Sequence, residues 1–442
     1  MKNYDAIVIG GGPAGLAAAY NLKSGGKSVA VFENDLWGGT CPNRGCDPKK
    51  MLLSGVEARD RIAQLQGKGY SDIPFMNWRD IEQFKETYTS KIPSGSKGGL
   101  DSAGIDTFHG DAKFISENEI QFDNETFHAD NFVIAAGQHP SILNIDGSEN
   151  LLTSNEFLSL KQMPKSITFI GAGYIAFELA NIANATGAEV HLVHHNDRPL
   201  KAFDSEFVDD MVSQMKSRGI KFHFNVNTKQ VVKNDDGYTL VGDDFKLNTD
   251  LIICATGRVP SVEGLDLDAA GIEYSAKGIQ VNENLQTTNK NIYAIGDVIA
   301  KSEPKLTPVA GFEAKYATDY LLGKTKEPIS YPAVPTLVYG SPKLAKVGVS
   351  VPEAEAAPDK YKIVSSNLTG WFTYYRLNEP VAKSKIIFDK NQQMVGATVL
   401  TEQADELINL LTIAIDKKIS NAEYTKMIMG YPTVASDLQY LI

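Results

Sequence analysis

Two cysteines separated by four residues are the sharpest chemical signal in this 442-residue sequence. Cys41 and Cys46 lie in the segment GGTCPNRGCDPKK at 38–50, and a pair at this spacing can close a small disulfide. The following pattern, KKMLLSGVEARDRIAQL, is typical of a helix that Pro48 could start. A thiolate near a helix N-terminus, with basic residues close by, has a lowered pKa. The segment therefore predicts a redox-active pair.

Two other interpretations of the cysteines are a zinc half-site and a pair of unrelated buried thiols. Zinc needs further ligands, and the only other cysteine, Cys254, sits within an apolar strand pattern. Three cysteines are also too few for a disulfide-stapled secreted scaffold. Because a glycine-rich pattern typical of dinucleotide binding precedes the pair at 5–33, we expect redox chemistry and no metal site.

The sequence opens with a strand, a glycine turn, a helix and a second strand. DAIVI at 5–9 is a buried strand pattern, GGGPAG follows at 10–15, and SVAVF at 28–32 leads to Glu33. Such glycines permit a tight turn and close approach of a pyrophosphate to the helix N-terminus, while the acid can bond a ribose. The unit predicts dinucleotide binding through Gly10, Gly12, Gly15 and Glu33.

The same pattern recurs at 166–195, where GAGYIA supplies Gly171 and Gly173. Two such units predict two nucleotides, most simply a flavin dinucleotide and a nicotinamide. The second strand ends in His194 and His195 without an acid that would repel a 2′-phosphate. Together with Arg198 and Lys201, these histidines favour NADPH over NADH. A solvated basic loop is the alternative interpretation.

The rest of the chain completes an α/β organisation. NFVIAAG at 131–137, DLIICATGR at 250–258 and IYAIGDV at 292–298 are strands that end in glycine turns or beside Asp297. From about residue 326, strand patterns alternate and then give way to a helix, ADELINLLTIAIDKK. We therefore expect two Rossmann-like dinucleotide-binding domains followed by a separate α+β domain.

Composition excludes some functions. The net charge of −11 argues against nucleic-acid binding. The sequence contains no apolar run of 18 residues, so we expect no membrane span. The N-terminus, MKNYDAIVIGGG, has no signal-peptide pattern. We expect a cytoplasmic protein that acts on a small molecule.

In order and spacing, the motifs GGGPAG, GGTCxNxGCxPKK, GAGYIAFE, CATGR, AIGD and LTPVA (306–310) resemble those of the flavin-dependent pyridine nucleotide–disulfide oxidoreductases. This is the family of glutathione reductase, lipoamide dehydrogenase and mercuric reductase. The resemblance covers essentially the whole chain and implies FAD, NAD(P)H and a homodimer. It further implies an FAD domain from 1–147 and 259–325, an NAD(P)H domain at 148–258, and an interface domain at 326–442.

The resemblance also implies roles for individual residues. Cys41 would attack the substrate and Cys46 would lie against the flavin, while Lys49 and Glu178 would form an ion pair near the flavin N5 edge. Asp297 would hold the ribityl chain of FAD. By the same resemblance, further cofactor contacts are expected from Lys50, Gly137, Ile175, Gly257, Pro308 and Val309.

The chain departs from the family at its C-terminus. Where the family has HPTxxEE, this chain reads YPTVASD at 431–437, so Tyr431 takes the place of the acid–base histidine and Ser436 that of its glutamate. A tyrosine, with an ordinary pKa of about 10, donates hydrogen bonds but shuttles protons poorly. We expect a substrate with a good leaving group, or one that needs no proton; alternatively, Tyr431 only fills space.

The redox segment departs as well, with Arg44 and Asp47 at positions that are usually apolar. Arg44 could stabilise a thiolate or attract an anion, and Asp47 would oppose thiolate formation, whereas a solvated Arg–Asp pair would do neither. The leading hypothesis is an NADPH-dependent flavoenzyme that reduces a small disulfide or oxidised thiol. The alternatives are a flavin reductase of a quinone, metal ion or reactive oxidant, and a flavin-binding redox sensor.

Overall fold

The computed structural model describes residues 2–441 and contains two compact units, each assembled from separate chain segments. The first unit comprises 2–48, 83–141 and 257–331, and the second comprises 49–82, 142–256 and 332–441. Helix α3 (Cys46–Gln64) begins in the first of these and continues into the second.

A seven-stranded sheet forms the centre of the first unit, in the order β3-β2-β1-β6-β5-β4, with β18 also paired to β6. The parallel pairing of β1 with β2 and β6 leaves residues 6–9 buried, as an all-apolar run requires. The strands are β1 (Lys2–Ile9), β2 (Val29–Glu33), β3 (Asp106–His109), β4 (Ala112–Ser116), β5 (Glu119–Phe122), β6 (Glu125–Ile134) and β18 (Ile292–Ala294).

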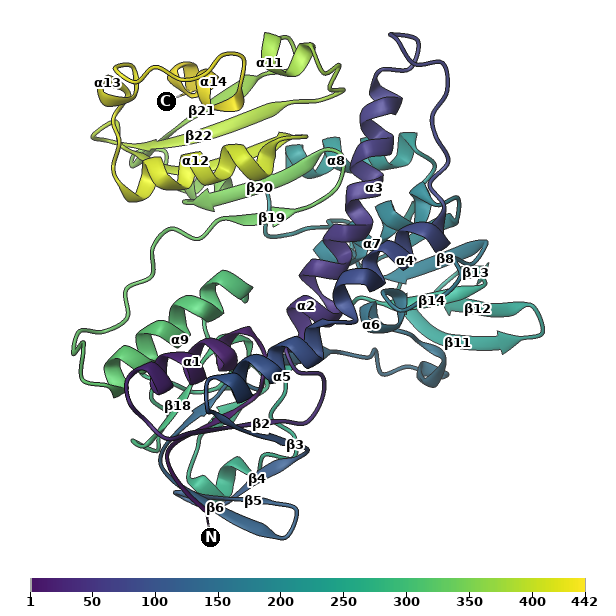
Figure 1. Ribbon diagram of the computed structural model, residues 1–442. Coiled ribbons are helices and arrows are strands. Elements are labelled where there is room, and N and C mark those ends of the chain that lie inside the picture. Colours follow the sequence, from purple (N-terminus) through teal and green to yellow (C-terminus); the bar gives the residue numbers. More distant parts are fainter. Residues whose placement is uncertain (1, 442) are drawn as a thin grey trace. The chain divides into compact units, whose positions relative to one another are not determined.

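Strand β18 reaches this sheet from far along the chain. It runs parallel to the second half of β6, with Ile292 opposite Phe132 and Ala294 opposite Ile134. Helices α1 (Pro13–Ser24) and α9 (Thr307–Leu321) lie side by side in this unit (Figure 1). Their alanines join the sheet residues in one apolar core, so both ends of the unit's sequence are needed to complete it.

Shorter elements surround this sheet. Helix α2 (Thr40–Arg44) precedes α3, and α5 (Ile92–Ser102) follows α4 (Trp78–Thr89). The remaining elements are β7 (Gln138–Pro140) paired with β15 (Arg258–Pro260), β16 (Tyr274–Ser275) paired with β17 (Gly278–Ile279), and the 3₁₀ turns η2 (Leu267–Ala270) and η3 (Gly296–Val298).

The second unit contains a four-stranded parallel sheet in the order β10-β9-β8-β14. Its strands and helices are β8 (Ser166–Ile170), α7 (Tyr174–Ala185), β9 (Glu189–Val193), α8 (Ser205–Ser217), β10 (Lys221–His223) and β14 (Leu251–Cys254), preceded by η1 (Ser148–Asn150) and α6 (Ser154–Phe157). An antiparallel sheet accompanies it, formed by β11 (Thr228–Asn234), β12 (Gly237–Gly242) and β13 (Phe245–Thr249).

A five-stranded antiparallel sheet, β19-β20-β23-β22-β21, forms the C-terminal part of this unit. Helix α12 (Ala404–Asp416) packs on it through its apolar face, including Leu407 and Leu411. The strands are β19 (Thr336–Val338), β20 (Lys343–Gly348), β21 (Tyr361–Asn367), β22 (Lys383–Asp389) and β23 (Met394–Thr401), and the short helices are α10 (Val351–Ala356), α11 (Phe372–Tyr375), α13 (Asn421–Tyr424) and α14 (Val434–Leu441).

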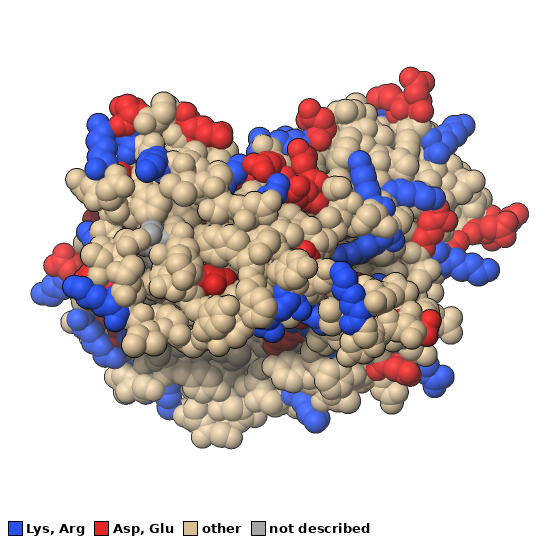
Figure 2. Space-filling view, turned by 90° about the horizontal axis from the view of Figure 1, so that it is seen from above, with Lys and Arg blue, Asp and Glu red and all other residues tan. Residues whose placement is uncertain are grey.

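The expected fold class is confirmed, because one mixed sheet and one parallel sheet each begin with a strand, a glycine turn, a helix and a parallel strand, and an α+β portion follows. Three local features differ from the expectation: α3 starts at Cys46 rather than at Pro48, α2 precedes it, and the β11–β13 sheet is additional. Basic and acidic side chains are interspersed on the face shown in Figure 2. Among residues 2–441, no helix is both long and apolar enough to cross a bilayer.

Candidate active site

The first glycine turn leaves one position open for a ligand. Gly10 has φ of +109° and a Cβ there would overlap the Ala135 carbonyl, while a Cβ on Gly15 would overlap the carbonyl of Gly10. These two glycines are therefore required by the fold itself. At Gly12, by contrast, a Cβ would meet only the Cα of Gly39, at an ordinary 3.6 Å. The space beside Gly12 and the N-terminus of α1 fits an approaching pyrophosphate.

Glu33 is tied to this turn. It is buried at the end of β2, where its Oε2 accepts the Gly11 N–H at 2.6 Å and its Oε1 accepts the Asp35 N–H at 2.7 Å. Burial raises the pKa of Glu33, although the Gly11 N–H acts in the opposite direction. The carboxylate is thus held beside the glycines, as a ribose ligand must be.

The second glycine turn, between β8 and α7, repeats this division of roles. Gly171 has φ of +111°, and a Cβ there would overlap the Ala255 carbonyl, whereas a Cβ on Gly173 would meet nothing within 4 Å. Gly173 caps α7, and Ile175 follows in its first turn. The open position at a helix N-terminus again fits a phosphate group.

The residues after β9 are basic or titratable and partly exposed. His195 and Lys201 are exposed and His194 is half-buried, with its pKa lowered by burial and by the neighbouring His195. Arg198 is occupied by a hydrogen bond from its Nη2 to the Phe203 carbonyl, at 3.1 Å. His195 has a partner as well, because its Nε2 lies 3.0 Å from the side-chain amide of Asn196. Lys201 and His195 are more exposed than Arg198.

The structure brings the two cysteines together. Cys41 lies half-buried on α2 and Cys46 is exposed at the start of α3, and their side chains are in hydrogen-bond contact. The pKa of Cys41 is raised, first by this bond, then by burial and by negative charge on Cys46. The expectation of a lowered thiol pKa is therefore wrong for Cys41, because two adjacent sulfurs compete for one negative charge.

Thr307 is a neighbour of the cysteines that the sequence motifs do not single out. Its Oγ1 lies 4.0 Å from the Cys46 Sγ, and its hydroxyl lowers the pKa of Cys41. Thr307 opens α9, directly before Pro308 and Val309. Thr307 belongs to the LTPVA motif, so the motif could have marked it as a site residue. Only the fold shows that its hydroxyl lies near the cysteine sulfurs.

Arg44 and Asp47 are engaged with different partners. Arg44 forms an ion pair with Asp35, and the Tyr88 hydroxyl donates to Asp47 Oδ2 at 3.2 Å. The charge of Asp47 raises the pKa of Cys41, so this carboxylate opposes thiolate formation, as expected. An arginine–aspartate pair is present, but it joins Arg44 to Asp35 rather than to its neighbour in the loop.

Lys49 and Glu178 form the expected ion pair in the second unit. Glu178 lies on α7 with its side chain 1% exposed, and its Oε1 accepts the Tyr339 N–H at 2.9 Å. Lys50 Nζ lies 3.7 Å from the same Oε1 and over the ring of Tyr339. A carboxylate this buried needs such partners, because an isolated buried charge is strongly unfavourable.

Asp297 lies in η3 of the first unit, in cationic surroundings. Burial raises its pKa, whereas Lys301, Arg258 and Lys305 act against the rise. The turn before it is fixed by Glu313, whose Oε2 accepts the Gly296 N–H at 2.7 Å. Gly137 and Gly257, both at positive φ, would admit a Cβ with no atom within 4 Å. These open positions, with that at Gly12, fit a bound dinucleotide in this unit.

Tyr431 lies in the loop between α13 and α14, with 72% of its surface exposed. Ser436, in the position of the family's glutamate, does not serve it: its hydroxyl donates to the Thr433 carbonyl at 2.7 Å. The phenol is thus exposed, and the side chain in the position of the family's glutamate is bonded elsewhere.

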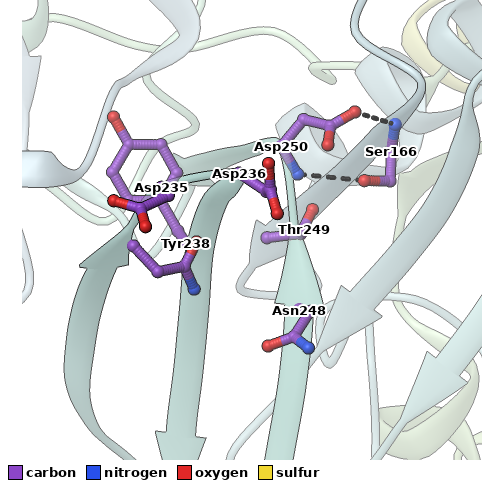
Figure 3. A pocket seen from close by; sticks show the side chains of 8 residues that line it. Ser166, Asp235, Asp236, Tyr238, Asn248, Thr249 and Asp250 are labelled. Carbon is purple, nitrogen blue, oxygen red and sulfur yellow. Dashed lines mark hydrogen bonds between the residues drawn. The ribbon is translucent and has the colours of Figure 1, made fainter.

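A hollow on the second unit lies apart from the expected site residues. It is lined by the start of β8, the β11–β12 turn and the end of β13, where Ser166 and Asp250 exchange two hydrogen bonds of 2.9 Å (Figure 3). Asp235 and Asp236 also line it. Three carboxylates would repel a pyrophosphate, so this hollow does not suit either nucleotide.

The family model for pyridine nucleotide-disulphide oxidoreductases matches residues 4–314, and the model for the dimerisation domain of the same family matches residues 334–442. The chain therefore belongs to the pyridine nucleotide-disulphide oxidoreductase family, and is an NAD(P)H-dependent flavoprotein oxidoreductase of the disulfide reductase class. Membership implies FAD and NAD(P)H as cofactors.

Individual relatives span the whole chain. A glutathione reductase from Nostoc sp. is 30% identical, with 98% of each chain covered. A dihydrolipoyl dehydrogenase from Bacillus subtilis is 30% identical over 97% of this chain and 94% of its own. The solved structure of the HOCl-induced flavoprotein disulfide reductase RclA from Escherichia coli shares the fold, with a TM-score of 0.90, 24% identity and 99% of each chain covered.

Proposed function

We propose that this chain is an NADPH-dependent disulfide reductase in which the electron pair of NADPH reaches the Cys41–Cys46 disulfide through FAD and then a small disulfide or oxidised thiol. The contact between the two cysteines, on the unit that carries the Gly12 turn, is the observation that best supports this. The family resemblance assigns substrate attack to Cys41 and the flavin-facing position to Cys46.

The chemistry at sulfur balances as follows. Reduction by the electron pair cleaves the Cys41–Cys46 disulfide and gives one thiol and one thiolate. The Cys41 thiolate attacks a substrate disulfide, forms a mixed disulfide and expels the first product thiolate. Cys46 then attacks Cys41, which expels the second product and restores the internal disulfide. Two electrons leave with two product thiols, and the protons come from solvent or from a positioned donor.

The proposed cofactor contacts come from residues of both units. Gly12, Glu33 and Asp297 would hold FAD, which accepts hydride from NADPH and passes electrons to sulfur. Gly173 and the basic residues after β9 would hold NADPH, with Lys201 and His195 facing its 2′-phosphate. Lys49 and Glu178 would flank the site of hydride transfer. The further contacts proposed are Gly10, Gly15, Lys50, Gly137, Gly257, Pro308 and Val309 for FAD and Gly171, Ile175 and His194 for NADPH.

For the acceptor, Tyr431 is the feature that matters. A phenol can donate a hydrogen bond but does not readily protonate a leaving thiolate. We therefore propose a small disulfide or oxidised thiol with a good leaving group. The family's dimerisation domain at 334–442 supports a homodimer in which Tyr431 serves the partner subunit's cysteines. We also propose domain boundaries after residues 147, 258 and 325. We further propose a cytoplasmic location.

The test is an anaerobic NADPH titration followed by rapid mixing with a panel of disulfides, quinones, metal ions and oxidants. A disulfide reductase takes up electrons at both flavin and disulfide and turns over with at least one disulfide or oxidised thiol. Turnover confined to quinones, metal ions or oxidants would favour the second candidate function, a flavin reductase of a non-disulfide acceptor. The missing histidine supports that candidate, because such acceptors release no thiolate. One reduction without turnover of any acceptor would indicate a sensor.

A further inference from the structure

The C-terminal tyrosine is stacked against another exposed aromatic ring. The rings of Phe372 and Tyr431 are nearly parallel, with an interplanar angle of 15° and centroids 6.2 Å apart, which is an offset-stacked arrangement. Both side chains are largely exposed, at 56% and 72%. An aromatic pair contributes only about 0.5–1.5 kcal/mol beyond the burial of its area, so further contacts are needed to hold these two exposed rings in one arrangement.

Two successive residues of the α11 segment contact the C-terminal segment and supply these further contacts. Trp371 packs edge to face with Tyr440 of α14, at 6.0 Å between centroids. Phe372 stacks on Tyr431. The segment therefore contacts both the Tyr431 loop and the helix that follows it.

Helix α11 is itself held by the core. Tyr374, the residue after Thr373, is fully buried among the apolar side chains of the C-terminal sheet and α12. The loop that carries Tyr431 is held at its base by the Thr433 hydroxyl, which donates to the Gly430 carbonyl at 2.6 Å. These contacts restrain the backbone on both sides of the stack. The face of the Phe372 ring therefore packs against the phenol ring in a defined position.

We propose that Phe372 is the positioning residue for Tyr431, and that stacking does here what the family's glutamate does for its histidine. Ser436 cannot do so, because its hydroxyl is bonded to Thr433. A carboxylate would orient an imidazole by a hydrogen bond, whereas a ring orients a phenol through its face and leaves the hydroxyl available to the acceptor. This inference rests on the proposed role of Tyr431 in acceptor reduction.

The test is a double-mutant cycle of Phe372→Ala and Tyr431→Phe, read by acceptor turnover and by rapid-reaction flavin reduction with NADPH. Phe372→Ala should lower acceptor kcat about three- to tenfold, the range expected for one aromatic pair, without slowing flavin reduction. In the Tyr431→Phe background the same change should have no further effect, because no hydroxyl remains to be positioned. Phe372→Trp should restore most of the lost turnover.

Tyr375→Ala is the matched control, since Tyr375 lies on the same helix with 70% of its surface exposed and should leave kcat unchanged. Phe372→Leu replaces the alanine variant if the latter fails to fold, and sedimentation confirms that each variant keeps its oligomeric state. An equal loss from Phe372→Ala in both backgrounds, or none in either, overturns the inference. If Tyr431→Phe itself turns over like the parent, the proposed role of Tyr431 fails and this inference with it.

Discussion

At the cysteine pair, the chemistry depends on which sulfur holds negative charge. Cys41 is disfavoured as a thiolate while Cys46 lies against it and Asp47 adds a second negative charge nearby. A bound flavin would withdraw charge from one sulfur and so relieve the competition. The raised pKa of Cys41 therefore belongs to the pair of sulfurs rather than to Cys41 alone.

Replacing each cysteine in turn should separate those roles. Two-electron reduction of the parent should give a long-wavelength thiolate-to-flavin charge-transfer band, because Cys46 is proposed to lie against the flavin. Cys46→Ser should abolish the band, whereas Cys41→Ser should keep it and lose disulfide turnover. Anaerobic absorption spectra and steady-state rates measure both effects. A band that survives in Cys46→Ser would mean that the assignment is wrong.

Removing the hydroxyl of Tyr431 tests the replacement of histidine. Tyr431→Phe should lower acceptor turnover about 10²-fold if the phenol donates to developing charge, while flavin reduction and the charge-transfer band stay unchanged. Tyr431→His with Ser436→Glu should raise activity on ordinary disulfides. The readouts are acceptor kcat and stopped-flow flavin reduction. Unchanged turnover in Tyr431→Phe would show that protons reach the product from solvent.

The basic residues after β9 should set the nucleotide preference. Lys201→Ala should reduce the ratio of kcat/KM for NADPH to that for NADH, because a cation facing the 2′-phosphate is lost. In the parent this ratio should grow as pH falls from 8 to 6.5, since protonated imidazoles add positive charge. Burial lowers the pKa of His194, so this imidazole becomes protonated only at a lower pH than a free one. Lys246→Ala is the control. A ratio that is constant with pH would exclude the histidines as ligands of the 2′-phosphate.

At the scale of elements, the two glycine turns separate folding requirements from binding requirements. Gly173→Ala should bind NADPH more weakly at an unchanged melting temperature, because the added Cβ meets no protein atom within 4 Å. Gly171→Ala should lower the melting temperature, because its Cβ overlaps a carbonyl at positive φ. Nucleotide titration measures the NADPH affinity of the two variants, and thermal unfolding measures their melting temperatures. Equal effects of the two changes on stability would contradict this division of roles.

These turns and Glu33 were predictable because each lies in a local motif with its own signature, whereas the ion pair of Lys49 and Glu178 was expected only from the family resemblance. The partners of Arg44 and Cys46 were not, since Asp35 and Thr307 reach them only through the folded chain. Phe372 carries no local signal at all: it is one aromatic residue among many until α11 meets the C-terminal loop. Pattern and spacing predict elements, whereas contacts distant in sequence need coordinates.

At the scale of the whole molecule, one carboxylate should make stability depend on pH. Burial raises the pKa of Glu402 to about 7, and its Oε1 accepts bonds from Ser341 Oγ at 2.6 Å and Gln64 Nε2 at 2.9 Å. Gln64 ends α3, the helix that Cys46 begins. Protonation of Glu402 thus favours the folded state.

The sign follows from the raised pKa. Glu402 contributes stability that is complete below its unfolded pKa of about 4.3 and is lost as pH rises through about 7. Glu402→Gln should remove this decline and exceed the parent at pH 8 by roughly 4 kcal/mol at most. Denaturant unfolding at pH 5 and pH 8 checks it, with the exposed Glu406→Gln as control. A parallel pH dependence in parent and variant would exclude Glu402 as its source.

The pairing of β18 with β6 has a consequence for how the polypeptide is made. Until Ile292–Ala294 emerge from the ribosome, Phe132–Ile134 of β6 lack this neighbour, although the rest of the sheet has long been synthesised. At about 5–20 residues per second, the nascent chain spends roughly 8 to 32 seconds with this apolar edge uncovered, and such edges invite pairing with other chains. Translation of the segment between β6 and β18 therefore sets how long this edge of the sheet stays unpaired in the nascent chain.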